Sequence, residues 1–314
     1  MTDRILDFAD GAAYLRVRND QLVVERKDQP DVSTPMAEVA AIILAHPQAT
    51  CSQPTIARLM TCGGALVVCD DSHLPVGVML PLVAHTTQTE RLAAQAAAPL
   101  PMRKQLWKQI VRRKILAQAD LLRQLHDDDF GLAELARSVR SGDPSNREAV
   151  ASRRYWPAIF DTRNTRMGGT CVPLVEPFRR RFDAPDANRL LNYGYAVLRA
   201  VVGRAICAAG LHPSLGLHHH NRYNAFCLAD DLMEPYRPLV DAAVVDHVRC
   251  HGHDAPLDRS AKQAILEAVL RRYRADGEVR TLFDIVARTA ASLARAYLKQ
   301  STLLDYPKMI EECV

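Results

Sequence analysis

Strand-like patterns fill the first 85 residues of the chain and then stop, which constrains the fold more than any other feature. Apolar runs and apolar–polar alternation predict strands at residues 14–18, 22–25, 41–44, 65–69 and 77–80. Asn19-Asp20 predicts a hairpin turn between the first two strands, and residues 50–62 predict a short helix. After His85 the apolar residues recur at helical spacings. The sequence therefore predicts an α+β fold, with a small β-rich domain over residues 1–85 and a larger all-α domain over residues 86–314.

The second domain is predicted to be helical at residues 103–125, 192–209, 239–248, 262–274 and 281–298. The helix over residues 192–209 is rich in small and apolar side chains, so we expect it near the centre of the helical core. Two segments lack any such pattern. Residues 164–175, which contain a Gly-Gly pair, predict a mobile loop, and residues 301–314 predict a flexible tail.

Composition excludes several classes of protein. With 314 residues, of which 48% are apolar and 24% charged, the chain can bury a sizeable core, and broad disorder is excluded. The eight cysteines include no C-x-x-C pair, which argues against a zinc ribbon or a disulfide framework and is typical of a reducing cytosol. No secretion signal opens the sequence, and no apolar run reaches the length of a membrane helix. We expect a soluble, cytoplasmic protein.

Charge is distributed unevenly along the chain. The net charge is +4, but residues 1–85 contain six Lys or Arg against ten Asp or Glu, so the helical part carries the positive excess. Such a basic part is typical of a surface that faces a polyanion, although a solvated helix face is the simpler interpretation. The candidates for DNA phosphate contacts are Arg112, Arg113, Arg179, Arg180, Arg181 and Arg237.

The segment 216–237 concentrates the chemistry of the chain, because three histidines follow a glycine and three acidic residues follow the histidines. Residues three and four apart share a helix face, so Glu234 can lie over Asp230 or Asp231. Pro235 has no N–H to donate, and we therefore expect a helix to start or bend there. Imidazole and carboxylate groups brought together in this way are a half-site for a divalent metal ion.

A further oxygen ligand could come from Glu148, which lies upstream. Asp143-Pro144-Ser145 predicts the start of a helix, with the proline in the first turn and the acidic side chain near the N-terminal amides. Glu148 would then lie early on that helix. A lone helical glutamate is most often solvated surface, so the residue pattern by itself leaves this role open.

Four segments together resemble the CRISPR-associated integrase of spacer acquisition, in its type II form. They are N-x-E-A at 146–149, Y-W-P at 155–157, N-Y-G-Y at 192–195, and G-L-H-H-x-N-x-Y-N-x-F-x-L-A-D-D-L-M-E-P-x-R at 216–237. The resemblance extends over nearly the whole chain, and its motifs are long and specific.

The resemblance implies that Glu148, His219 and Glu234 are both the catalytic residues and the metal ligands. In the family, the histidine is the third residue after the glycine, and the second acid follows fifteen positions later, which favours Glu234 over Asp231. Asp230 and Asp231 are then capping or supporting groups. Two carboxylates and one imidazole, without a thiolate, suit Mg²⁺ or Mn²⁺.

The resemblance also implies a reaction and an assembly. The 3′-hydroxyl of a captured DNA fragment would attack the repeat boundary of a CRISPR array, as part of antiviral defence. The amino-terminal domain would be a β-sandwich that forms a homodimer. Two dimers would flank a small adaptation partner subunit in a hetero-hexamer bound to double-stranded DNA, with no membrane involved.

Two other functions remain open on the sequence alone. A metal-dependent endonuclease acting on branched or single-stranded DNA would use the same three ligands, with water as the nucleophile. A DNA-binding scaffold with a vestigial metal site would keep the arginines but would not need the ligands. No Ser, Tyr or Cys in the 216–237 segment is paired with an activating base; Tyr223 is the nearest candidate, and we expect it to pack beside the turn.

Overall fold

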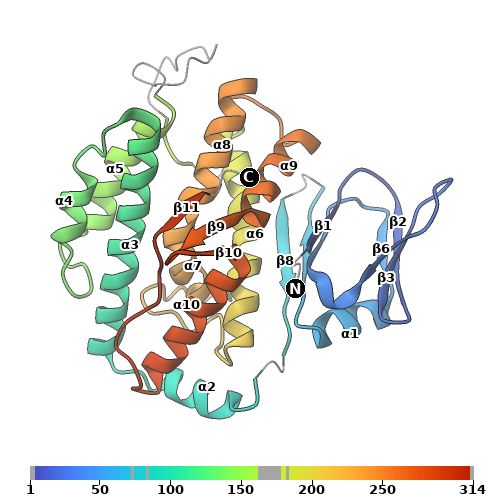
Figure 1. Ribbon diagram of the computed structural model, residues 1–314, viewed down its shortest axis with the longest axis horizontal. Coiled ribbons are helices and arrows are strands. Elements are labelled where there is room, and N and C mark those ends of the chain that lie inside the picture. Colours follow the sequence, from blue (N-terminus) through green and yellow to red (C-terminus); the bar gives the residue numbers. More distant parts are fainter. Residues whose placement is uncertain (1–3, 72–73, 83–84, 162–177, 182–183, 312–314) are drawn as a thin grey trace.

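Two four-stranded sheets form the amino-terminal part of the computed structural model, which describes residues 4–71, 74–82, 85–161, 178–181 and 184–311 (Figure 1). The first sheet has the order β1 (Arg4–Phe8), β5 (Val39–Leu44), β7 (Ala65–Cys69) and β8 (Pro75–Met79). The second has the order β4 (Val32–Pro35), β3 (Gln21–Glu25), β2 (Ala13–Arg18) and β6 (Ala49–Cys51). The predicted hairpin is confirmed, since β2 and β3 pair antiparallel and Asn19 and Asp20 between them have φ values of 49° and 59°.

Strand β5 and the first three residues of β7 are buried on both faces of the first sheet, and this explains their continuous apolar runs. Side chains alternate across a strand, so Ile42 of β5 and Leu66 of β7 join Leu15 and Leu22 of the second sheet in a small core. That core is closed by α1 (Gln53–Thr61). Ile43 of β5 points the other way, into the large core of the helical part. The first sheet therefore contributes side chains to both hydrophobic cores.

Helices make up most of the remaining chain, and α3, α4 and α5 lie on the side farthest from the sheets (Figure 1). Helix α6 runs through the middle, as predicted, and Gly194 on it fits so closely that an added Cβ would lie 2.3 Å from Val240 Cγ1. None of the helices in the described ranges is both long and apolar enough to cross a membrane. The helices are α2 (Gln88–Ala96), α3 (Leu100–His126), α4 (Leu132–Arg137), α5 (Arg147–Ile159), α6 (Ala187–Ala208), α7 (Cys227–Met233), α8 (Arg237–His251), α9 (Arg259–Leu270) and α10 (Leu282–Tyr297).

The fold class is the predicted one, but the helical part carries a small sheet that the sequence analysis missed. The helix predicted to reach residue 274 ends at Leu270, and β9 (Arg272–Ala275) and β10 (Glu278–Thr281) follow as an antiparallel hairpin. Asp276-Gly277 forms its turn with φ values of 52° and 84°. Asp-Gly between strand-forming residues is a strong hairpin signal, so this element was readable from the sequence.

The predicted flexible tail is wrong for the residues that the structure describes. Residues 301–311 cross α3, and β11 (Met309–Glu311) then pairs antiparallel with β9. Gln109 of α3 donates to the Thr302 carbonyl and accepts from the Leu304 amide, and Tyr306 donates to the Leu232 carbonyl of α7. This segment therefore ties α3, α7 and the small sheet together.

Two further predictions concern segments between elements. The predicted domain boundary at residue 85 falls between β8 and α2. The predicted mobile loop at residues 164–175 lies outside the described residues.

Candidate active site

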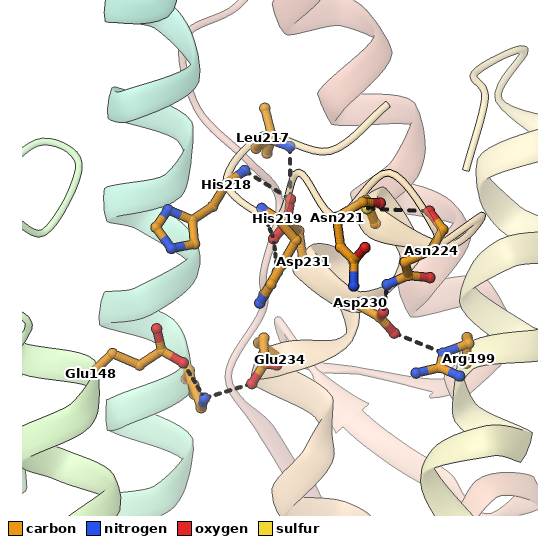
Figure 2. Close-up of polar contacts among 12 residues, drawn as sticks. Glu148, Arg199, Leu217, His218, His219, Asn221, Asn224, Asp230, Asp231 and Glu234 are labelled. Carbon is orange, nitrogen blue, oxygen red and sulfur yellow. Dashed lines mark hydrogen bonds and ion pairs between the residues drawn. The ribbon is translucent and has the colours of Figure 1, made fainter. Parts of the chain in front are cut away.

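Asp231 holds the histidine turn in place. It lies on α7 and is fully buried, and its carboxylate accepts hydrogen bonds from the backbone amides of Leu217, His218 and His219, at 2.7, 2.9 and 3.3 Å. Its Oδ1 also lies 2.5 Å from Nδ1 of the His219 ring (Figure 2). Gly216 is required here, since an added Cβ would lie 2.4 Å from the His219 carbonyl oxygen. The predicted supporting role of Asp231 thus matches its contacts.

The Asp231 contact also determines which nitrogen of His219 can react. An imidazole that uses Nδ1 to bond a carboxylate presents Nε2 to a ligand, which is the usual arrangement of metal-binding histidines. The hydrogen bond to Asp231 raises the pKa of His219; burial opposes this rise, while the charges of Asp231 and Glu234 reinforce it. Figure 2 shows His219 above Glu234, with Asp231 beside it.

The other two histidines of the turn have different surroundings. The His218 ring stacks on the buried Trp107 of α3, with ring centroids 4.3 Å apart and an interplanar angle of 2°. His219 meets the same indole edge-on at 5.9 Å, and all three histidines are exposed to solvent in part. His218 therefore anchors the turn to α3, while His219 faces the acidic residues.

Glu148 occupies the first turn of α5, and Asp143 fixes the start of that helix. The Asp143 carboxylate accepts from the backbone amides of Arg147 and Glu148, at 2.9 and 3.0 Å. Asn146 is the N-cap and accepts from the Ala149 amide at 3.3 Å. The acidic side chain near the amides is as predicted. The prediction that the proline lies in the first helical turn is wrong, since Pro144 precedes the cap.

Glu234 lies in a single 3₁₀ turn, η2 (Glu234–Tyr236), between α7 and α8. The predicted bend at Pro235 is therefore confirmed. One carboxylate oxygen of Glu234 is 3.0 Å from Arg237 Nε and the other is 2.6 Å from Lys114 Nζ. Burial opposes the ionisation of Glu234, but the charges of Arg237 and Lys114 outweigh it and lower its pKa. The carboxylate is consequently ionised at neutral pH.

Lys114 brings the two predicted glutamates together. It lies on α3, is buried, and places Nζ 2.5 Å from Glu148 Oε1 as well as 2.6 Å from Glu234 Oε2. In Figure 2 the dashed lines from Glu148 and Glu234 meet at one nitrogen atom. Burial opposes the charge on Lys114, but Glu234 and Glu148 outweigh it and raise its pKa. Lys114 was not among the predicted site residues. The feature of the sequence that indicates it is a charged residue on the apolar face of a helix.

The donor set fits a hard divalent cation, although the geometry is that of an ion pair. Two carboxylates converge on one positively charged point, and the His219 imidazole, oriented by Asp231, lies above Glu234. Within the part of the chain that the structure describes, no three His, Cys, Asp or Glu side chains are grouped closely enough to hold a metal ion. The ammonium group of Lys114 stands at the point between the two carboxylates.

A polar cavity of about 400 Å³ opens beside His219. The loop that carries His220, Arg222 and Asn224 lines one side of it, and Arg103 of α3 lines another. Asp230 holds this loop, since it accepts from the Asn224 amide group at 2.7 Å and pairs with Arg199 of α6 at 2.7 Å. The walls next to His219 thus carry cationic and amide groups suited to an anionic ligand.

The six arginines proposed to contact phosphate fall into two groups. Three of them are engaged within the protein: Arg113 donates to the Pro307 carbonyl, Arg180 to Asn188 and Asn192, and Arg237 is paired with Glu234. The other three, Arg112, Arg179 and Arg181, have exposed side chains. Among the described residues, this second group is the one available to a phosphate without breaking an internal contact.

This chain is similar in sequence and in fold to known proteins. The family model of CRISPR associated protein Cas1 matches residues 8–272, and the chain belongs to that family. It is 35% identical over 272 residues to the CRISPR-associated endonuclease Cas1 of Neisseria meningitidis serogroup C (strain 8013), covering 86% of this chain and 84% of that protein. The resemblance to a CRISPR-associated integrase is thereby confirmed.

Two solved structures share the fold at low sequence identity. A casposase bound to integration product superposes with a TM-score of 0.72 and 19% identity, covering 98% of this chain and 93% of that one. A Cas6-RT-Cas1–Cas2 complex gives a TM-score of 0.68 and 19% identity, covering 96% of this chain and 35% of the matched one. At these identities the likeness is one of fold.

Proposed function

We propose that the protein is a metal-dependent DNA integrase of CRISPR adaptation, which joins the 3′-hydroxyl ends of a captured DNA fragment to the repeat boundary of a CRISPR array. The observation that carries this proposal is the convergence of Glu148 and Glu234 on one cationic point, beneath a histidine oriented by Asp231. Membership of the Cas1 family supports it. So does the shared fold with a casposase described with an integration product.

The residues of the chain have distinct roles in this mechanism. Glu148, Glu234 and Nε2 of His219 would hold Mg²⁺ or Mn²⁺, which when bound polarises the phosphodiester and lowers the pKa of the attacking hydroxyl. Asp231 keeps the His219 ring in the required tautomer and orientation. Arg237 fixes the second Glu234 oxygen and lies over the Tyr195 ring, with its guanidinium carbon 4.5 Å from the ring centroid. The carboxylate is thus oriented from the side opposite Lys114.

The nucleophile in this proposal comes from DNA. Tyr223 is 80% exposed, and its hydroxyl accepts a hydrogen bond from the Arg222 guanidinium, which is not a base. Activation of a tyrosine for attack on phosphorus would need a base in contact with its hydroxyl. A site that polarises the phosphate and ionises a hydroxyl has no need of a covalent protein intermediate.

The proposed assembly contains a homodimer and a small partner subunit. Large apolar side chains are exposed on the amino-terminal sheets and just after them, among them Val32, Val76 and Leu82. Interaction surfaces expose contiguous apolar patches, and the proposed dimer would cover these side chains. The shared fold with a chain of a Cas6-RT-Cas1–Cas2 complex supports a partner of the Cas2 kind, the hexamer itself being part of the proposal, and the exposed arginines support DNA binding.

A strand-joining assay tests the proposed reaction. A donor duplex with 3′-hydroxyl ends should be joined to a plasmid that carries repeats, in Mg²⁺ or Mn²⁺ and with the partner subunit present. A donor with 3′-phosphate ends should not be joined, and Tyr223→Phe should keep the activity. Cut products without joined ones would favour the endonuclease alternative. A covalent protein–DNA adduct after denaturation would contradict the mechanism.

A further inference from the structure

The charges around Lys114 are balanced without a metal ion, and this limits how a divalent ion can bind there. Two carboxylates, Glu148 and Glu234, and two cations, Lys114 and Arg237, form a compact neutral group in which Lys114 and Glu234 are buried. If a divalent ion joined them while the ammonium group stayed, four positive charges would face two negative ones. Buried charges without compensation are costly. The ion and the ammonium group therefore compete for the same position.

The geometry leads to the same conclusion. Glu148 Oε1 accepts a hydrogen bond from Nζ at 2.5 Å, and Glu234 Oε2 forms an ion pair with Nζ at 2.6 Å. Mg²⁺ binds oxygen at about 2.0–2.1 Å, so the two carboxylates need to close in by only about 0.5 Å on an ion placed at the same point. The four-carbon stem of a lysine is flexible, so the exchange would be a movement of this side chain.

We propose that Lys114 is an internal counter-cation, which holds Glu148 and Glu234 together in the metal-free protein and is displaced from between them when the divalent ion binds. This inference rests on the proposed metal site and adds an exchange step to it. Without the metal ion, the protein would keep Glu148 and Glu234 close together, because the ammonium group offsets the repulsion between the two carboxylates. The ammonium group weakens ion binding, since each ion bound must replace two charge-assisted contacts.

The first test measures Mn²⁺ binding by isothermal titration calorimetry and by the shift in Tm, without DNA. Lys114→Met should bind Mn²⁺ on the order of tenfold more tightly than the wild type and should gain more in Tm from the ion. Lys108→Met is the matched control, because it removes the same charge from the same helix and Lys108 forms no ion pair among the described residues. Its affinity should equal that of the wild type. Equal or weaker binding by Lys114→Met would overturn the proposal.

A second test uses the wild-type protein and does not depend on how the variant folds. Reductive methylation followed by mass spectrometry reports the accessibility of each lysine. Lys114 should be protected without metal and should become labelled at saturating Mg²⁺, whereas labelling of Lys108 stays constant. Unchanged protection of Lys114 at an ion concentration that raises Tm would overturn the exchange but leave the metal site intact. A wild type that binds no divalent ion would overturn both.

Discussion

The three predicted ligands differ in what holds each of them, although they are expected to act as one site. Glu148 depends on the cap at Asp143, His219 on Asp231, and Glu234 on Arg237 and Lys114. Replacing any one by alanine should reduce strand joining by on the order of 10³-fold or more, and double variants should lose little further, because each single change already dismantles the site.

Two quantities are measured for each variant: the rate of strand joining and the Kd for DNA. DNA affinity should remain near that of the wild type, because His219 and the glutamates would contact the ion and not most of the phosphates. Asp231→Ala is expected to lose activity and stability together. If Glu234→Ala stayed active while Asp231→Ala kept its stability and lost joining, the second acid of the site would be Asp231.

The residue pattern pointed to the histidine turn and the acids after it, and the family resemblance added Glu148, but neither predicted the contacts between them. His218 and His219 are equivalent in local sequence, and they are distinguished by Trp107 and Asp231, which come from other elements. Lys114 was missed because its partners are 34 residues away in the case of Glu148, and still farther along the chain in the case of Glu234. A charged residue on an apolar helix face signals a buried partner, but it does not say which partner.

At the scale of elements, the start of α5 controls the position of Glu148. Asp143→Ala removes the acceptor of two backbone amides, and we expect a loss of about 1–2 kcal/mol in the free energy of unfolding, typical of a lost helix cap. Joining activity should fall as well, because the first turn of α5 carries the ligand. Urea unfolding and the joining assay check this result. Glu134→Ala, in the first turn of α4, is the control, since Glu134 is exposed and pairs only with Arg137 at the surface.

A buried carboxyl group links three helices and gives stability a dependence on pH. Asp241 of α8 accepts hydrogen bonds from Tyr155 of α5, at 2.6 Å, and from Tyr195 of α6. Burial raises the pKa of Asp241 to about 6, although both tyrosines and Arg237 act in the opposite direction. The protonated form therefore contributes stability that is full below the unfolded pKa of about 3.9 and is lost as pH rises through about 6.

Asp241→Asn should reveal this dependence, because an amide does not ionise. Between pH 4 and pH 7 the variant should gain stability relative to the wild type, by up to about 3 kcal/mol. Urea unfolding of both proteins across that range measures the difference. A difference that does not change with pH would show that Asp241 has an ordinary pKa.

Element boundaries were predicted best where one local signal determines them. The Asn19-Asp20 hairpin and the bend at Pro235 depend on residues adjacent in sequence, and both were correct. The strand at residues 309–311 has no such signal, because it forms by pairing with β9, which is distant in sequence. A strand of this kind cannot be predicted from its own residues.

At the scale of the whole molecule, DNA binding should depend on the exposed arginines. Replacing Arg179 and Arg181 together by glutamine should weaken binding to any DNA sequence and reduce the slope of log K against log[salt] by about 0.9 per lost contact. Arg180→Gln is expected to act differently, because its guanidinium is bonded to Asn188 and Asn192 of α6. It should lower Tm and leave the salt slope nearly unchanged. Fluorescence anisotropy at several salt concentrations distinguishes the double variant from Arg180→Gln. An unchanged slope for the double variant would show that Arg179 and Arg181 are solvated and do not contact phosphate.

The path of residues 301–311 also determines when the site can be completed during synthesis. Helices α3 and α7 leave the ribosome long before this segment, yet Gln109 and the Leu232 carbonyl find their partners only in Thr302, Leu304 and Tyr306. A nascent chain that has not reached these residues lacks the tie between the two helices that carry Lys114 and Asp231. Chains truncated before residue 301 should consequently show little strand joining, because this tie between α3 and α7 is missing.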